Sequence, residues 1–145
     1  MLSPIILSVF LFLYGYNYSN IEEQKQHVKV CHKSDLIQKH DTPFTSTRMV
    51  DTKHLVSIFL HLAPGAEIPE HHHPVYRENI VALSGELSLW LNDEKHTVRA
   101  GDIVFVPAGT IMRGVNEGDS DFTAAATFAN TGKIGPLMVM GRPKE

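Results

Sequence analysis

The chain has 145 residues, one cysteine and a formal net charge of −3 at pH 7. That length predicts one domain with a hydrophobic core of its own, and the lone Cys31 cannot form a disulfide within the chain. The slightly acidic balance lacks the basic excess of nucleic-acid-binding proteins, so we expect no nucleic-acid partner.

Residues 1–20 are apolar and uncharged. The apolar run from Pro4 to Tyr14, about eleven residues, is too short to cross a bilayer as a helix. Its length suits a secretory signal peptide, although no Lys or Arg precedes it and no small-residue cleavage site follows. An interfacial anchor or a strand that pairs with a partner subunit are the alternatives. We expect a secreted or periplasmic protein if the segment is a signal peptide and a cytoplasmic one otherwise, with membrane contact only if the segment is retained.

Residues 21–52 form a polar N-terminal extension whose charges indicate a solvated surface and no separate domain. Val28 to Val30 alternates like a short edge strand, and Ser34 to Ile37 fits one helical turn. Thr42-Pro43 marks a break in the chain. The first barrel strand is predicted to begin only at His54.

Residues 53–131 are punctuated by glycine and proline, and the short segments between them have the alternation typical of strands. No stretch has a convincing helical period, so we predict an all-β sandwich or barrel followed by a tail over residues 132–145. In that tail, Leu137 to Met140 is apolar and fits a last strand, a cover for the barrel or a subunit contact. The predicted strands are His54–Leu62, Glu67–His73, Asn79–Leu83, Glu86–Leu91, Lys95–Arg99, Ile103–Val106, Ile111–Val115 and Asp121–Phe128.

Three consecutive histidines end the second of these strands. Because side chains alternate along a strand, His71 and His73 point to one side and His72 to the other. Pro74 ends the ladder, and a strand that resumes at Glu78 can bring a carboxylate back to the two imidazoles. Two imidazoles and a carboxylate with open positions suit non-haem iron, and also manganese, nickel, cobalt or zinc. The alternative is a polar loop with no ligand role.

A second motif follows between Gly101 and Asn116, with a hairpin turn, a short buried strand and a second turn. Together the two stretches resemble the cupin superfamily, as a small single-domain cupin of the type-2 kind. The first cupin motif, G-x5-H-x-H-x(3,4)-E-x6-G, is matched throughout by Gly65, His71, His73, Glu78 and Gly85. The second, G-x5-P-x-G-x2-H-x3-N, is matched by Gly101, Pro107, Gly109 and Asn116.

The resemblance implies a jelly-roll barrel, also called a double-stranded β-helix, with a metal held by His71, His73 and Glu78. It also implies a homodimer formed through sheet contacts. In the family the histidine of the second motif is usually the fourth ligand, but here that position holds Met112. No histidine follows His96 to replace it.

Met112 leaves three alternatives open. It can be an inert wall that leaves more metal positions free, a weak thioether ligand that favours copper, or the mark of a site that has lost its metal. His54 and His61, in the strand before Gly65, can compensate if they point into the barrel; otherwise they are partly exposed polar residues.

Strand alternation also predicts the lining of the pocket. Residues on the same face as Glu78 or Met112 should make an apolar wall with a small polar cluster, which is the usual composition of a small-molecule site. The residues placed inward in this way are Ile80, Ala82, Gly114 and Asn116. Phe105, Trp90 and Tyr76 are candidates for the rim, the core or a dimer contact, whereas Arg77 and Arg113 should point away.

Two functions fit these observations. The first is a binding or sensing module in which a divalent transition metal (iron, manganese, nickel, zinc or copper) holds a small oxygenated molecule. The alternative is a metal-dependent enzyme, such as a dioxygenase, isomerase or lyase. The short chain and the missing fourth histidine favour the binding module. No catalytic residue is assigned, since the only acid–base candidates are His54, His61 and Tyr76, and no cofactor other than the metal is expected.

Overall fold

Antiparallel strands make up nearly all of the part of the chain that the computed structural model describes, residues 30–36 and 42–144. The predictions for residues 1–20 and for the edge strand that starts at Val28 lie outside these ranges. No helix in the described ranges is long and apolar enough to span a membrane. The predicted helical turn is present as the short helix α2 (Lys33–Leu36).

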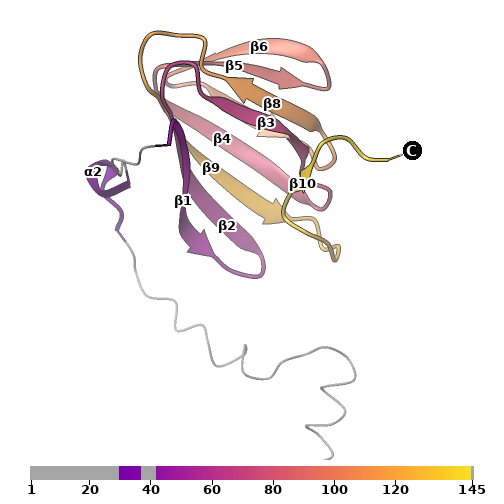
Figure 1. The fold of residues 1–145 in the computed structure, drawn as a ribbon. Coiled ribbons are helices and arrows are strands. Elements are labelled where there is room, and N and C mark those ends of the chain that lie inside the picture. Colours follow the sequence, from indigo (N-terminus) through magenta and orange to yellow (C-terminus); the bar gives the residue numbers. More distant parts are fainter. Residues whose placement is uncertain (1–29, 37–41, 145) are drawn as a thin grey trace, which may run out of the picture. The chain divides into compact units, whose positions relative to one another are not determined.

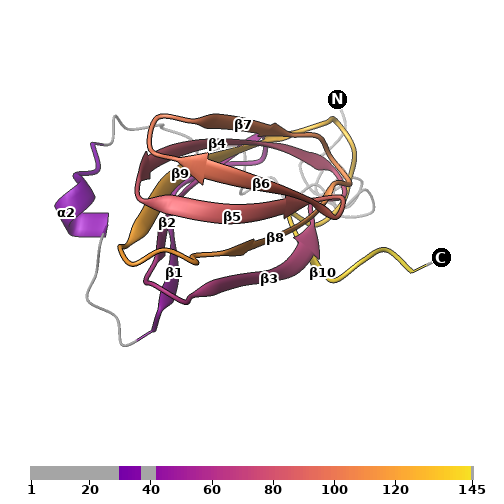
Figure 2. The ribbon, with the colours of Figure 1, turned by 90° about the horizontal axis from the view of Figure 1, so that it is seen from above.

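The strands form two five-stranded sheets that curve around a shared interior (Figure 1 and Figure 2). One sheet has the order β1-β2-β9-β4-β7 and the other β10-β3-β8-β5-β6. This is the all-β, double-stranded β-helix architecture predicted from the sequence. The strands are β1 (Phe44–Asp51), β2 (Leu55–Leu62), β3 (Glu67–His72), β4 (Tyr76–Ser84), β5 (Glu86–Leu91), β6 (Glu94–Arg99), β7 (Ile103–Val106), β8 (Ile111–Val115), β9 (Phe122–Asn130) and β10 (Val139–Met140).

The core lies between the sheets because each strand turns its apolar side chains inward. In β5, Leu87 and Leu89 are buried, as the alternation predicts. The central strand β9 places Ala124 and Ala126 inward with no exposed surface. The larger side chains of the core cluster come from both sheets and include Leu62, Leu87, Leu89, Val106, Met112, Phe122 and Phe128.

Two turns show why the sequence folds locally as it does. Asn92 and Asp93 both have positive φ, 48° and 71°, as a two-residue hairpin turn between β5 and β6 requires. Gly85 has a φ of +73°, and a Cβ there would lie 2.4 Å from the backbone oxygen of Asp121. Only glycine fits this corner without a shift of the backbone. Gly65, with a φ of +79°, also confirms the predicted corner before β3.

The first strand of the barrel corrects the sequence prediction. Residues 44–51 were expected to be solvated surface, but they form β1 and pair with β2 from Phe44 opposite Leu62 to Asp51 opposite Val56. The segment FTSTRMVD is an edge strand, and only one of its faces packs against the barrel. Polar residues are therefore tolerated along it, and its sequence shows no clear alternation of apolar and polar residues. This strand precedes the range 53–131 that we assigned to the barrel. At the other end, β10 confirms the predicted last strand and pairs with β3.

Candidate metal centre

A cavity of about 350 Å³ lies between the two sheets. Its walls are almost entirely apolar, and the described residues contribute four polar side chains to the lining: Ser46, His71, His73 and Glu78. The apolar residues of the lining are Phe44, Ile58, Leu60, Ile68, Pro69, Ile80, Leu87, Leu89, Val98, Met112, Phe122, Phe128, Met138 and Met140. The predicted composition, an apolar wall with a small polar cluster, is present.

Two of the three histidines reach this cavity, His71 from the end of β3 and His73 from the position just after that strand. His71 and His73 both line it, and their ring centroids lie 5.1 Å apart in an edge-on arrangement. His72 is also buried, but its ring is outside the lining and its Nδ1 lies 2.8 Å from the carbonyl oxygen of Gly141. The alternation predicted from the sequence is therefore correct.

Backbone carbonyls orient both cavity histidines. The Nδ1 atom of His71 lies 2.7 Å from the oxygen of Pro69, and that of His73 lies 2.6 Å from the oxygen of Leu137. A carbonyl oxygen only accepts hydrogen bonds, so each Nδ1 must carry the proton and donate it. The Nε2 atom of each ring is then left with a free lone pair. Metal-binding histidines in proteins are usually held in this way.

Glu78 comes from β4 and meets His73 in the interior. Only 3% of Glu78 and 5% of His73 is exposed. The Oε2 atom of Glu78 lies 3.7 Å from Nε2 of His73, and within the described residues neither atom has a hydrogen-bond partner. Two ligand atoms, each about 2.1 Å from one metal ion, can be at most about 4.2 Å apart. The separation is thus compatible with two ligands of one metal.

Burial makes both groups neutral in the metal-free protein near pH 7. Desolvation raises the pKa of Glu78 to about 8 and lowers the pKa of His73 to about 4. The pKa of His71 is also lowered, mainly by burial. The His73–Glu78 contact is therefore not an ion pair at neutral pH. The histidines are ready to accept a metal, whereas Glu78 must first lose a proton.

His71, His73 and Glu78 share a cavity, but the three side chains do not converge on one point. Among the described residues, no group of three or more His, Cys, Asp or Glu side chains is arranged as a ready metal site. His73 and Glu78 form the close pair, and His71 stands beside His73. Ligation by all three remains a prediction from the motif.

Met112 is buried and lines the same cavity. In the β3–β8 ladder it lies opposite His71, which explains why the two side chains share one wall. Asn116, by contrast, is fully buried but outside the lining. Its amide donates to the carbonyl oxygens of Leu62 and Ser120, at 3.0 Å and 2.9 Å. Its role is to fix the turn after β8, and the expectation that it belongs to the pocket is wrong.

His54 and His61 do not compensate for the missing histidine. His61 lies on β2 between two inward leucines, so its own side chain faces outward, where its Nε2 is 2.9 Å from Asp121 Oδ2. His54 is exposed in the turn before β2. Neither lines the cavity.

The three aromatic candidates also lie outside the cavity lining. Phe105 is exposed, and Tyr76 packs against the core cluster. Trp90 has two cations over its ring, Arg113 at 3.8 Å and Lys95 at 5.0 Å from the centroid. Arg77 and Arg113 are exposed, as predicted.

The two terminal strands also contribute to the lining, and the sequence indicated this cover only for the C-terminal one. Phe44 and Ser46 of β1, and Met138 and Met140 at β10, all line the cavity. The apolar run at Leu137–Met140 was a signal for the second group, but nothing in the polar segment 44–51 indicates the first.

Comparisons with known proteins agree with this architecture. A family model described as a cupin domain matches residues 58–128. A Klebsiella pneumoniae subsp. pneumoniae structure, described as an uncharacterized conserved protein with a double-stranded β-helix domain, is 19% identical. It has a TM-score of 0.70 over 81% of this chain and 100% of that chain.

Two further solved structures are similar. An rmlc-like cupin family protein from Methanocaldococcus jannaschii is 25% identical, with a TM-score of 0.57 over 65% of this chain and 87% of that chain. A structure of oxalate oxidase is 20% identical, with a TM-score of 0.59 over 70% of this chain and 57% of that chain. No curated protein shows significant similarity to the sequence. The likenesses establish the fold.

Proposed function

Residues 58–128 of this chain form a cupin domain, and from this premise we propose that the protein is a metal-holding binding module. A divalent transition metal binds His73 and Glu78, with His71 as the third ligand. One observation supports this most directly: Nε2 of His73 and Oε2 of Glu78 are buried 3.7 Å apart in a mainly apolar cavity, and neither has a hydrogen-bond partner among the described residues.

The burial of Nε2 of His73 and Oε2 of Glu78 favours a bound cation. A buried polar atom without a partner costs about 1–3 kcal/mol. A divalent metal held by His73 and Glu78 would offset both costs together. Nδ1 of His73 would keep its proton and its hydrogen bond to the carbonyl oxygen of Leu137, so the ring would keep its orientation. Glu78 would have to release its proton to solvent in order to hold the metal.

The donor set suits iron, manganese, nickel or zinc, and the thioether of Met112 suits copper if it joins the site. When bound, the metal supplies a Lewis acid to an oxygen atom of the ligand. The chain itself orients the two imidazoles and surrounds the site with apolar side chains. Those side chains exclude water, which strengthens every polar contact inside.

The ligand of this cavity is a small molecule with an apolar body and one oxygen-bearing end. The volume of about 350 Å³ lies at the small end of the usual range for ligand pockets. The oxygen-bearing end would lie toward the proposed metal-binding residues, because Ser46 is the one other polar side chain that the described residues bring to the lining.

Turnover is the alternative function. Apart from the proposed ligands, the described lining offers no side chain with the pKa of a general acid or base, which favours binding. The alternative would be a metal-dependent enzyme such as a dioxygenase, isomerase or lyase, in which substrate would bind at a metal position that Met112 leaves open. Oxalate oxidase is among the structural neighbours, at an identity that shows only the fold.

Elemental analysis of the untagged protein, purified without added metal, tests the proposal. We expect about one metal ion per chain in the wild type, and at least about tenfold less in His73→Ala. His96→Ala is the matched control, because His96 is an exposed histidine of β6. Equal and low metal in all three proteins, even after reconstitution, contradicts the metal site.

Mass spectrometry of small molecules released from the same protein separates the two functions. A molecule that is recovered unchanged after prolonged incubation with the metal-loaded protein supports a binding module. Its conversion to a product, lost in His73→Ala, supports the enzyme.

A further inference from the structure

The C-terminal segment Leu137–Arg142, here called the strap, is attached to the candidate site at several points. The carbonyl of Leu137 accepts the hydrogen bond from Nδ1 of His73. Met138 and Met140 line the cavity. The strap therefore both orients a proposed ligand and forms part of the wall, although it lies about sixty residues further along the chain than the histidines.

Hydrogen bonds to His72 and His73 hold the strap, but burial contributes little to its attachment. Its strand β10 consists of Val139 and Met140, which pair with His72 and His71 of β3. About half of Met138 (49%) and of Met140 (56%) is exposed. So short and exposed a strand gains little free energy from burial. An additional fixing point at the end of the strap therefore strengthens its attachment.

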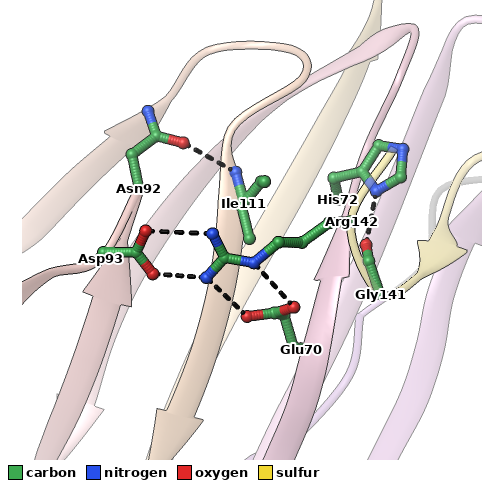
Figure 3. A network of polar contacts seen from close by, with 7 residues as sticks. All are labelled: Glu70, His72, Asn92, Asp93, Ile111, Gly141 and Arg142. Carbon is green, nitrogen blue, oxygen red and sulfur yellow. Dashed lines mark hydrogen bonds and ion pairs between the residues drawn. The ribbon is translucent and has the colours of Figure 1, made fainter. Parts of the chain in front are cut away.

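Arg142 supplies that fixing point, as Figure 3 shows. Its Nε and Nη2 atoms lie 3.1 Å and 3.0 Å from the two carboxylate oxygens of Glu70. Its Nη1 lies 3.0 Å from Oδ2 of Asp93, and Nη2 also reaches the other oxygen of that carboxylate. One planar guanidinium thus makes two forked contacts, the strongest geometry for such a pair.

The two carboxylates belong to separate, well-fixed parts of the sheet. Glu70 lies on β3, and Asp93 lies in the β5–β6 turn. The neighbouring Asn92 accepts a hydrogen bond from the amide of Ile111 at 3.0 Å, which holds that turn against β8 (Figure 3). Beside the guanidinium, the amide of Gly141 donates to the carbonyl of Glu70 at 2.7 Å.

We propose that Arg142 is a positioning residue of the metal site. Its ion pairs with Glu70 and Asp93, here called the latch, fix the end of the strap. The latch thereby keeps the Leu137 carbonyl hydrogen-bonded to His73 and keeps Met138 and Met140 over the cavity. When the latch opens, the strap leaves the cavity and the His73 ring loses its orienting acceptor. The role of the strap at a metal site rests on the function proposed above, but its closure is a property of the protein without metal.

The test compares Arg142→Ala, Arg142→Lys and the control Arg99→Ala. Arg99 is an exposed arginine paired with Glu86 at 2.8 Å on β6, outside the cavity lining and the strap. In the metal-free proteins, we expect the Gly141 amide to exchange with solvent about three- to tenfold faster in Arg142→Ala than in the wild type. The lysine variant should lie between the two, because an ammonium cannot fork to two carboxylates. Arg99→Ala should match the wild type.

Nitrogen NMR of the His73 imidazole gives a readout that a purely structural role would not change. The wild type should have the proton on Nδ1, and Arg142→Ala should populate the Nε2-protonated form as well. If Arg142→Ala had the same Gly141 exchange rate and the same His73 tautomer as the wild type, the proposal would be overturned. Asp93→Asn, which weakens one side of the latch, should give a smaller change of the same sign if Arg142→Ala folds poorly; no change there would equally overturn it.

Zinc loading and release into a chelator then connects the strap with the metal. We expect Arg142→Ala to release zinc about three- to tenfold faster than the wild type and Arg99→Ala. If the wild type binds no zinc, the proposed function fails while the exchange and tautomer measurements still decide whether the latch exists. Normal zinc release with an opened strap would overturn the link to the site.

Discussion

Burial of Glu78 makes its ionised form unfavourable, and no hydrogen bond to Oε2 from the described residues offsets this cost. Its folded-state pKa of about 8 lies above the ordinary value of 4.5, so the folded state binds more protons than the unfolded state between these pH values. Stability from this group is therefore present at low pH and is lost as the pH rises toward 8. For His73 the pH dependence has the opposite sign, because its folded-state pKa of about 4 lies below the ordinary value of 6.5. Its contribution to the stability of the fold therefore rises with pH and is complete above pH 6.5.

The first prediction follows from these two signs. Between about pH 6.5 and 8, the metal-free wild type should lose stability relative to Glu78→Gln, by at most about 1.4 kcal/mol per pH unit. Urea unfolding of both proteins at several pH values measures the difference. A parallel pH dependence of the two would show that Glu78 is ionised in the folded state at neutral pH.

Met112 allows a second prediction at the residue scale. Because it lies opposite His71 and lines the cavity, Met112→His should add an imidazole to the site and raise zinc affinity by about tenfold or more. Met112→Leu keeps the volume and removes the sulfur. If Met112 is only a wall, the leucine variant binds zinc and copper(I) as the wild type does. A selective loss of copper(I) would identify the thioether as a ligand.

At the element scale, the corners of the barrel decide which strands can meet. Gly85 should not tolerate a side chain, since its φ is positive and an added Cβ would meet the backbone of Asp121. Gly85→Ala should cost about 3 kcal/mol, whereas Gly101→Ala should cost about 1 kcal/mol. Gly101 also has a positive φ, +92°, but nothing lies within 4 Å of its added Cβ. Urea midpoints of the two variants measure the difference, and equal costs would contradict the close approach at Gly85.

Some strands could be predicted from the sequence and others could not. β5, β7 and β8 have the predicted bounds, because each is short, alternating or apolar, and flanked by turn residues. β1 was missed because an edge strand needs only one partner and can carry Thr, Ser and Arg. Its inclusion depends on pairing with β2, which no local pattern encodes.

At the scale of the whole molecule, we propose a homodimer formed through strand β7. This strand is at the edge of its sheet, and its outward residues Ile103 and Phe105 are 68% and 61% exposed. An exposed apolar edge strand is a typical place for sheet-to-sheet association. The free edge and its apolar face together favour a second copy of this chain as the partner.

Light scattering tests this last prediction. Phe105→Lys should shift the protein toward a monomer, while Val50→Lys, an exposed change on the edge strand β1 of the same sheet, should leave the mass unchanged. A wild type that is monomeric at all concentrations would contradict the dimer. Equal effects of the two lysines would assign the contact to a different surface.

The sequence by itself determined the fold class, most of the strands and the inward direction of His71, His73 and Glu78. These features depend on the two-residue period of a strand and on glycine and proline corners, which are local properties of the chain. The motif spacing therefore sufficed to bring the three side chains to one cavity.

The tertiary structure alone decided how that cavity is built and charged. Asn116 shares the predicted face but turns its amide to Leu62 and Ser120, and His61 turns to Asp121. Burial from every side sets the pKa of Glu78, and Arg142 reaches Glu70 across 72 positions of sequence. Such features arise from residues that are distant along the chain and adjacent only after folding, so no local pattern could predict them.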